Sequence, residues 1–320
     1  MKTLMIIAAI VAGVALGAPA MAQTKPMISV IVKDTTSPYW QAVLAGARKA
    51  GQELGANVVE LGAQSETDAT GQIGLLEKAV AANPAAILIA PAQSAALAKP
   101  IDEAAKKVKI IGLESGADTK SLTAIVGTDN ANAGRIAAGA LATVIQRSYA
   151  DAEGDVVVIR AIPGVASLDQ RVKGFKDEIA ANFRAIDIAS EQAGDGKPAT
   201  AAGLMQDAIA NTADLRGVFT PDPLSTEAVA HAVMEKKSGD KINVIGVGAD
   251  ERLVKLLQDD VIAGLVVEDP FRMGYDGVKT ALAASRGEKV AANVDTGATL
   301  VTKANLSSAR SQELLKPIVK

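Results

Sequence analysis

The chain has 320 residues, which leaves room for about two domains. Apolar residues make up 49% of it and charged residues 22%, a composition that supports a buried core and argues against a disordered chain. The absence of cysteine excludes disulfides and thiolate catalysis, and the single histidine, His231, excludes a multi-histidine metal site. A net charge of -3 argues against nucleic-acid binding, and we expect neither a metal nor a cofactor.

The N-terminus has the pattern of a secretory signal peptide. Basic Lys2 precedes an apolar run over 4–16, and Ala20 and Ala22 supply the small residues of a cleavage site. The run is too short for a typical membrane span, so an uncleaved anchor is the weaker alternative. We expect cleavage after Ala22, a mature chain beginning at Gln23, and export to a bacterial periplasm, where a cysteine-free chain carries no thiol to oxidise.

Beyond this segment, short apolar runs alternate with longer runs that have apolar residues at helical spacing. The apolar runs predict strands, in chain order, at 27–32, 58–61, 86–90, 109–113, 124–126, 156–160, 186–190, 217–219, 244–247 and 264–267. The longer runs predict helices at 38–54, 69–82, 94–107, 131–146, 169–181, 200–211, 225–236, 251–258 and 271–285. About ten strand–helix units exceed one sheet, so we expect an α/β fold with two doubly wound parallel sheets, each covered by helices on both faces.

Ligands of doubly wound sheets bind beyond the carboxyl ends of the strands, so the residues that follow each strand are candidates for a site. After the first strand come Lys33, Ser37, which is placed to cap a helix, and the aromatic pair Tyr39 and Trp40. Aromatic rings at this edge are suited to stacking on the apolar face of a sugar. The alternative is a core aromatic pair beneath a loop.

Polar and acidic residues recur after the later strands in both halves. They are Glu114 and Ser115, Asp129 and Asn130, Arg171, Asp222, Asp250, and Glu268 and Asp269. Any single carboxylate in such a position is most often a helix cap. Their recurrence at strand ends in both halves favours a shared site.

Four motifs carry a family resemblance when they are taken in order. They are Ser37-Pro38-Tyr39-Trp40, Thr128-Asp129-Asn130, the run from Arg171 to Phe175, and the run from Glu268 to Gly274. Together they resemble periplasmic binding proteins of the ribose, allose and galactose group, from Met27 to the C-terminus. The resemblance implies a type I periplasmic binding fold whose two lobes close on a monosaccharide. It also implies delivery to the permease of an ABC importer, a monomer, and no catalysis.

The resemblance also implies that the chain crosses between the lobes at a three-segment hinge. The N-terminal lobe would hold 27–129 and 269–299, and the C-terminal lobe 130–268 and 300–320. Asp129 lies at the first of these crossings, so it is as well placed for a hinge role as for ligand contact.

Carried over by position, the resemblance implies that Tyr39 and Trp40 stack on one ring face while Arg171 binds the ring oxygen and hydroxyls. The other implied contacts are Lys33, Ser37, Glu114, Ser115, Asp222, Asp250 and Glu268. In two of these positions, 222 and 268, the family has neutral amides where this chain has carboxylates. No aromatic residue stands near 195–196, where the family has the aromatic that covers the second ring face.

Four acids in one cleft, against Lys33 and Arg171, repel each other unless a cation joins them. A charge-assisted hydrogen bond contributes about 1.5–3 kcal/mol, so we expect an amino sugar, of the glucosamine or galactosamine type. The first alternative is a neutral hexose or pentose, because carboxylates also accept hydrogen bonds from sugar hydroxyls. The second is another small polyol.

Other functional classes lack the residues they need. A dinucleotide-binding oxidoreductase needs a glycine-rich loop after the first strand, and the segment 33–38 has no glycine. The effector lobe of a sugar-responsive repressor shares the fold but needs a DNA-reading domain, where here a signal peptide precedes the first strand. A glycosidase needs a spaced pair of carboxylates, which the acidic cleft could mimic, but the family resemblance implies no catalysis. The loaded protein could also dock on a chemoreceptor.

Overall fold

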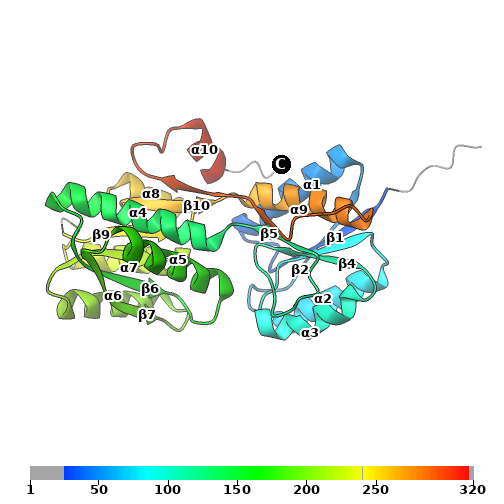
Figure 1. The fold of residues 1–320 in the computed structure, drawn as a ribbon, viewed down its shortest axis with the longest axis horizontal. Helices are drawn as coiled ribbons and strands as arrows, with labels where there is room; N and C mark the ends of the chain where they lie inside the picture. The colour runs from blue at the N-terminus through cyan, green and yellow to red at the C-terminus, as the bar shows by residue number, and fades with distance from the viewer. Residues whose placement is uncertain (1–24, 240, 317–320) are drawn as a thin grey trace, which may run out of the picture.

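The computed structural model describes residues 25–239 and 241–316. They form two α/β lobes that lie side by side (Figure 1). The predicted signal peptide and its cleavage after Ala22 lie outside the described residues. No helix in the described ranges is long and apolar enough to cross a membrane.

The first lobe is built on a six-stranded parallel sheet in the order β11-β5-β4-β3-β1-β2. Its strands are β1 (Met27–Val32), β2 (Asn57–Gly62), β3 (Ala86–Ile89), β4 (Lys109–Leu113), β5 (Ala124–Gly127) and β11 (Asn293–Asp295). Helices α1 (Pro38–Leu54) and α9 (Pro270–Ser285) cover one face, and α2 (Ala69–Ala81) and α3 (Ser94–Ala105) cover the other. The central strands β1 and β3 are almost wholly buried, as expected of strands that have helices on both sides.

The second lobe repeats this plan with the sheet order β12-β10-β9-β8-β6-β7. Its strands are β6 (Gly154–Arg160), β7 (Ile186–Ala193), β8 (Leu215–Thr220), β9 (Asn243–Val247), β10 (Gly264–Glu268) and β12 (Ala298–Val301). Helices α4 (Asn130–Tyr149) and α5 (Ala166–Asn182) cover one face; α6 (Pro198–Asn211), α7 (Pro223–Glu235), α8 (Glu251–Gln258) and α10 (Ala309–Leu315) lie on the other. The predicted pair of doubly wound lobes is confirmed.

The chain passes between the lobes at three places: from β5 to α4, from β10 to α9, and from β11 to β12. The third crossing falls earlier than the predicted boundary at 299/300. Ala298 and Thr299 already pair with β10 in the antiparallel edge of the second sheet. The apolar and helical patterns did not predict β11, β12 and α10, because no residue of β11 and only Val301 of β12 is fully buried, and α10 buries only Ser311 and Leu314.

The crossings are bonded to one another and to the C-terminal helix. The Asp129 backbone N–H donates to Asp295 Oδ1 at 2.9 Å, which joins the first crossing to the third. At the second crossing, Asp269 caps α9, and its other oxygen lies 2.8 Å from Arg310 Nη2 on α10. The hinge is therefore a bonded unit, with α10 fastened to it.

In the second lobe, α4 and α5 cross at two glycines beside the cleft. A Cβ on Gly134 would lie 2.0 Å from the Arg171 carbonyl oxygen, and one on Gly174 would lie 1.9 Å from that of Ala131. Only glycine permits so close an approach of two backbones. The crossing thereby fixes the turn of α5 that carries Arg171.

Candidate ligand-binding site

One wall of the cleft is formed by residues that follow β1 and β4. Lys33 Nζ lies 2.9 Å from Glu114 Oε2, and the two side chains are only 14% and 9% exposed. Burial acts to lower the pKa of Lys33, but the Glu114 carboxylate outweighs it and the pKa lies above its ordinary value. Burial acts to raise the pKa of Glu114, and Lys33 reverses that shift, so the pKa lies below its ordinary value. Both groups are therefore charged in the folded protein.

Glu114 has a left-handed backbone, with φ 64°. The Ser115 N–H donates to the Leu113 carbonyl at 2.7 Å, which closes a tight three-residue turn at the end of β4. Gly127 on the neighbouring strand makes room, since a Cβ there would lie 2.7 Å from the Glu114 carbonyl oxygen. A glutamate in this conformation is costly, so the surrounding structure holds the carboxylate in place.

The two aromatic residues at the start of α1 are perpendicular. Their ring centroids are 5.0 Å apart with an interplanar angle of 84°. Trp40 is 2% exposed, its Nε1 donates to Glu66 Oε1 at 2.8 Å, and the Lys33 ammonium lies 5.6 Å from its ring centroid. Tyr39 is half-buried, and its hydroxyl donates to Met273 Sδ at 3.3 Å. Perpendicular rings do not form one flat surface, so the expected joint stacking on one sugar face does not fit this structure. Trp40 is core here.

The opposite wall centres on Arg171, which is 4% exposed. Its Nη2 lies 2.7 Å from Glu268 Oε1, Nε donates to Asn130 Oδ1 at 2.8 Å, and Nη1 donates to the Pro221 carbonyl at 3.0 Å. Burial acts to lower the pKa of Arg171, but Glu268 and then Glu114 raise it above its ordinary value. Since Asn130 begins α4 and Glu268 ends β10, this one guanidinium binds residues at two hinge crossings.

The charges of the two walls act on one another across the cleft. The pKa of Tyr39 lies well above its ordinary value because of burial first, and then because of the carboxylates of Glu268 and Glu114. Glu268 also contributes to the raised pKa of Lys33. The structure therefore brings five predicted residues into one electrostatic neighbourhood: Lys33, Tyr39, Glu114, Arg171 and Glu268.

Asp222 differs from this group, because three hydrogen bonds inside the second lobe hold its carboxylate. It is 6% exposed and caps α7, where Oδ1 accepts from the Ser225 N–H at 2.8 Å. Oδ2 accepts from the Ala161 N–H at 2.9 Å and the Ser225 hydroxyl at 2.7 Å. In this structure the oxygens of Asp222 are held by the ends of β6 and α7, so the residue serves as a helix cap, and its contact with a ligand stays a prediction.

Two further predicted residues are helix caps at the edge of the cleft. Ser37 Oγ accepts from the Trp40 N–H at 3.4 Å at the start of α1. Asp250 Oδ1 accepts from the N–H groups of Arg252 and Leu253, at 3.0 and 3.1 Å, at the start of α8. The Asp250 side chain is 36% exposed, so it keeps access to solvent.

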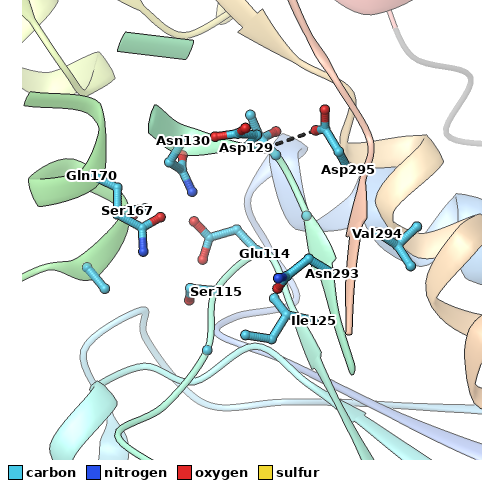
Figure 2. Close-up of a pocket in the computed structure, with 14 residues that line it drawn as sticks. Glu114, Ser115, Ile125, Asp129, Asn130, Ser167, Gln170, Asn293, Val294 and Asp295 are labelled. Atoms are coloured by element: carbon cyan, nitrogen blue, oxygen red, sulfur yellow. Dashed lines mark hydrogen bonds between the residues drawn. The ribbon is translucent and has the colours of Figure 1, made fainter. Parts of the chain in front are cut away.

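A cavity of about 390 Å³ opens between the lobes beside the hinge (Figure 2). Glu114, Ser115 and Asp295 line it from the first lobe and the crossings, while Asn130, Ser167 and Gln170 line it from α4 and α5. Asp129 also lines it, and caps α4 through the Asn132 N–H. The sequence missed Asn293 and Asp295, because the edge strand β11 has no fully buried residue and therefore no apolar run to mark it. It missed Asn130 as a site residue although the strand-end rule points to it.

In the described part of the chain, no group of three histidine, cysteine, aspartate or glutamate side chains is arranged to hold a metal ion. The carboxylates of the cleft are instead held by a lysine, an arginine and backbone N–H groups. The arrangement offers charged and neutral hydrogen-bonding groups to a small polar molecule.

Two lobes joined by three crossings around a polar cleft define a protein that binds a small ligand between closing halves. The comparisons agree: the chain belongs to the periplasmic binding protein domain family, whose sequence pattern matches residues 28–289. Its relatives are periplasmic sugar-binding proteins and not enzymes.

Relatives and solved structures cover nearly the whole chain. The ribose import binding protein RbsB of Escherichia coli (strain K12) is 24% identical over 300 residues, 93% of this chain and 98% of its own. A carbohydrate transporter solute binding protein from Agrobacterium radiobacter, solved in complex with D-arabinose, is 50% identical with a TM-score of 0.83, and covers 92% of this chain and 100% of its own. An ABC transporter solute binding protein from Agrobacterium vitis, bound with alpha-D-tagatopyranose, is 27% identical with a TM-score of 0.81, over 91% and 99%.

Proposed function

We propose that this protein captures a monosaccharide in the periplasm and delivers it to the permease of an ABC importer. The observation that carries the proposal is two buried ion pairs, Lys33 with Glu114 in the first lobe and Arg171 with Glu268 in the second, whose charges act on one another between the lobes. Charged groups held in place are strong partners for sugar hydroxyls. The family membership and the D-arabinose complex of the 50% identical Agrobacterium radiobacter protein support the same reading.

The favoured ligand is a neutral pentose or hexose. The argument for an amino sugar needed carboxylates in excess, but Glu114 already has Lys33, Glu268 has Arg171, and Asp222 is occupied as a cap. An ammonium would then have to displace an existing cation or bind a carboxylate outside the two ion pairs, either Asp250 or the cavity-lining Asp129 and Asp295. A neutral sugar needs neither, because its hydroxyls can donate to and accept from pairs that stay intact.

We assign direct ligand contact to the residues that share the electrostatic neighbourhood and to two neighbours at the cleft edge. They are Lys33, Tyr39, Glu114, Ser115, Arg171, Asp250 and Glu268. Supporting roles fall to the buried or capping residues Ser37, Trp40 and Asp222. Tyr39 supplies the ring surface for the apolar face of the sugar.

Closure follows from where these residues lie. A sugar that bonds to Glu114 on one lobe and to Arg171 on the other adds contacts that exist only when the lobes approach. Arg171 is bonded to the first and second crossings through Asn130 and Glu268, so ligand contact is made next to the segments that bend. The closed form then presents both lobe surfaces to the permease.

The test is isothermal titration calorimetry of the mature chain with D-arabinose, D-ribose, D-allose, D-glucosamine and D-galactosamine. We expect at least one neutral sugar to bind with micromolar or tighter affinity and to raise the melting temperature. An Arg171→Met variant, which leaves Glu268 unpaired, is expected to abolish that response. Tight binding of an amino sugar alone would restore the charge argument. A melting temperature that no saccharide moves would end the proposed function.

Delivery to a permease is tested separately from binding. In a strain that lacks the gene for this chain, uptake of the radiolabelled ligand should fall to background and return when the gene is restored. Uptake that persists unchanged would point to docking on a chemoreceptor or sensor instead.

A further inference from the structure

Asn130 occupies a position with unusual constraints for a residue without an assigned role. It is the first residue of α4, directly after the first crossing between the lobes, and only 4% of it is exposed. It also lines the cavity beside Glu114, Ser167 and Gln170. A buried amide at a cavity wall must find partners for both of its ends.

The hydrogen bond from Arg171 determines the orientation of the Asn130 amide. Its Oδ1 accepts from Arg171 Nε at 2.8 Å. A guanidinium has donors and no acceptor, so the amide oxygen must face Arg171 and the NH₂ group must face away from it. Figure 2 shows the Asn130 amide nitrogen directed into the cavity, on the side where the Glu114 carboxylate enters from the other lobe.

A sugar bound in this cleft needs hydrogen-bond donors for its hydroxyl oxygens. A sugar hydroxyl has one proton to give and two lone pairs to fill. Glu114 and Glu268 accept hydrogen bonds, so a hydroxyl that donates to one of them still needs a donor for its own oxygen. Arg171 Nε and Nη1 donate to Asn130 and Pro221, and its Nη2 lies 2.7 Å from Glu268 Oε1. The Asn130 NH₂ group is a neutral donor held rigidly toward the same space.

We propose that Asn130 is a ligand-contacting, specificity-determining residue, whose Nδ2 donates to a sugar hydroxyl that itself donates to a cleft carboxylate such as Glu114. This inference rests on the proposed function and adds a contact to the same site. One amide thus performs two tasks: its oxygen positions Arg171, and its nitrogen donates a hydrogen bond to the ligand. Because Asn130 lies at the hinge, this contact joins the ligand directly to a segment that moves on closure.

Asn130→Asp separates the two tasks. The aspartate keeps an oxygen for Arg171 Nε, with added charge, and a carboxylate is favourable in the first turn of a helix. A residue that only positions Arg171 therefore tolerates the change. If Asn130 also donates to the ligand, the hydroxyl now lies between two carboxylates with a single proton, and one of them is left unsatisfied. We expect the affinity for the sugar that binds the wild-type chain to fall about 10- to 100-fold, with the melting temperature of the free protein unchanged.

Two comparison variants complete the experiment. Asn130→Ala removes both tasks and is expected to weaken binding at least as much as Asn130→Asp. Asn132→Asp adds the same charge two residues further along α4, where the side chain does not line the cavity, and is expected to bind like the wild type. An Asn130→Asp variant with wild-type affinity, or an Asn132→Asp variant that loses as much, would overturn the inference. A wild-type chain that binds no sugar would instead refute the proposed function.

Discussion

Lys33→Met tests the physical basis of the site, because it removes the cation from a buried carboxylate. Glu114 Oε2 lies 2.9 Å from the Lys33 ammonium and its side chain is 9% exposed. Removing one partner of a buried ion pair costs about 3–5 kcal/mol, because the remaining charge is buried without compensation. Lys33 is 14% exposed, so the pair is not wholly desolvated, and we expect a loss at the lower end of this range, about 3 kcal/mol in the free energy of unfolding.

The stability lost in Lys33→Met should depend on pH, because the substitution changes the pKa of Glu114. In the wild type, the pKa of Glu114 is depressed below 4.5, so its contribution to stability is present above that pH and is lost as pH falls through the folded-state pKa. In Lys33→Met the desolvation that Lys33 had outweighed becomes dominant, and the pKa of Glu114 rises above 4.5. As pH falls, protonation of Glu114 then stabilises the folded variant, whereas it destabilises the folded wild type. The difference between the two proteins should narrow as pH falls from about 7 to about 4.

Urea unfolding of both proteins at the two pH values measures this directly. Glu114→Gln in the Lys33→Met background is the matched control, since it removes the orphaned charge and should recover part of the loss. A stability difference that is the same at both pH values, or a double variant no more stable than Lys33→Met, would refute the assignment of a charged, mutually stabilising pair.

Three further substitutions probe the second lobe. Asp222→Asn keeps one oxygen to cap α7 but places an NH₂ group against the Ala161 N–H or the Ser225 N–H, and should cost about 1–3 kcal/mol of stability in urea unfolding; an unchanged midpoint would contradict the assignment of both Asp222 oxygens as acceptors. Gly134→Ala puts a Cβ 2.0 Å from the Arg171 carbonyl and should cost about 1–3 kcal/mol and weaken sugar binding, whereas Gly139→Ala on the same helix, with nothing within 4 Å, should be neutral or stabilising. Equal effects of the two alanines would argue against a helix crossing that positions Arg171. Arg171→Met should weaken sugar binding by at least about 2 kcal/mol in calorimetry, since Glu268 loses its partner.

The sequence alone predicted the two-lobed fold and several charged residues that interact between the lobes. Apolar runs that alternate with helical periods imply parallel sheets between helices, and parallel strands place their following residues at one edge. The family resemblance singled out Arg171, and the strand-end rule pointed to Lys33, Glu114 and Glu268. It could not distinguish a carboxylate that faces a ligand from one that caps a helix, because Asp222 and Glu268 both follow strands and precede helices.

The partners of these charged side chains became visible in the tertiary structure alone, because they come from distant parts of the chain. The lysine and arginine that the sequence counted against a surplus of acids are each paired with one acid, and a third acid serves backbone N–H groups. The perpendicular packing of Tyr39 and Trp40 and the orientation of the Asn130 amide depend on partners far away in the chain. Composition measures net charge, whereas recognition depends on which donors and acceptors are left over once the protein has satisfied its own.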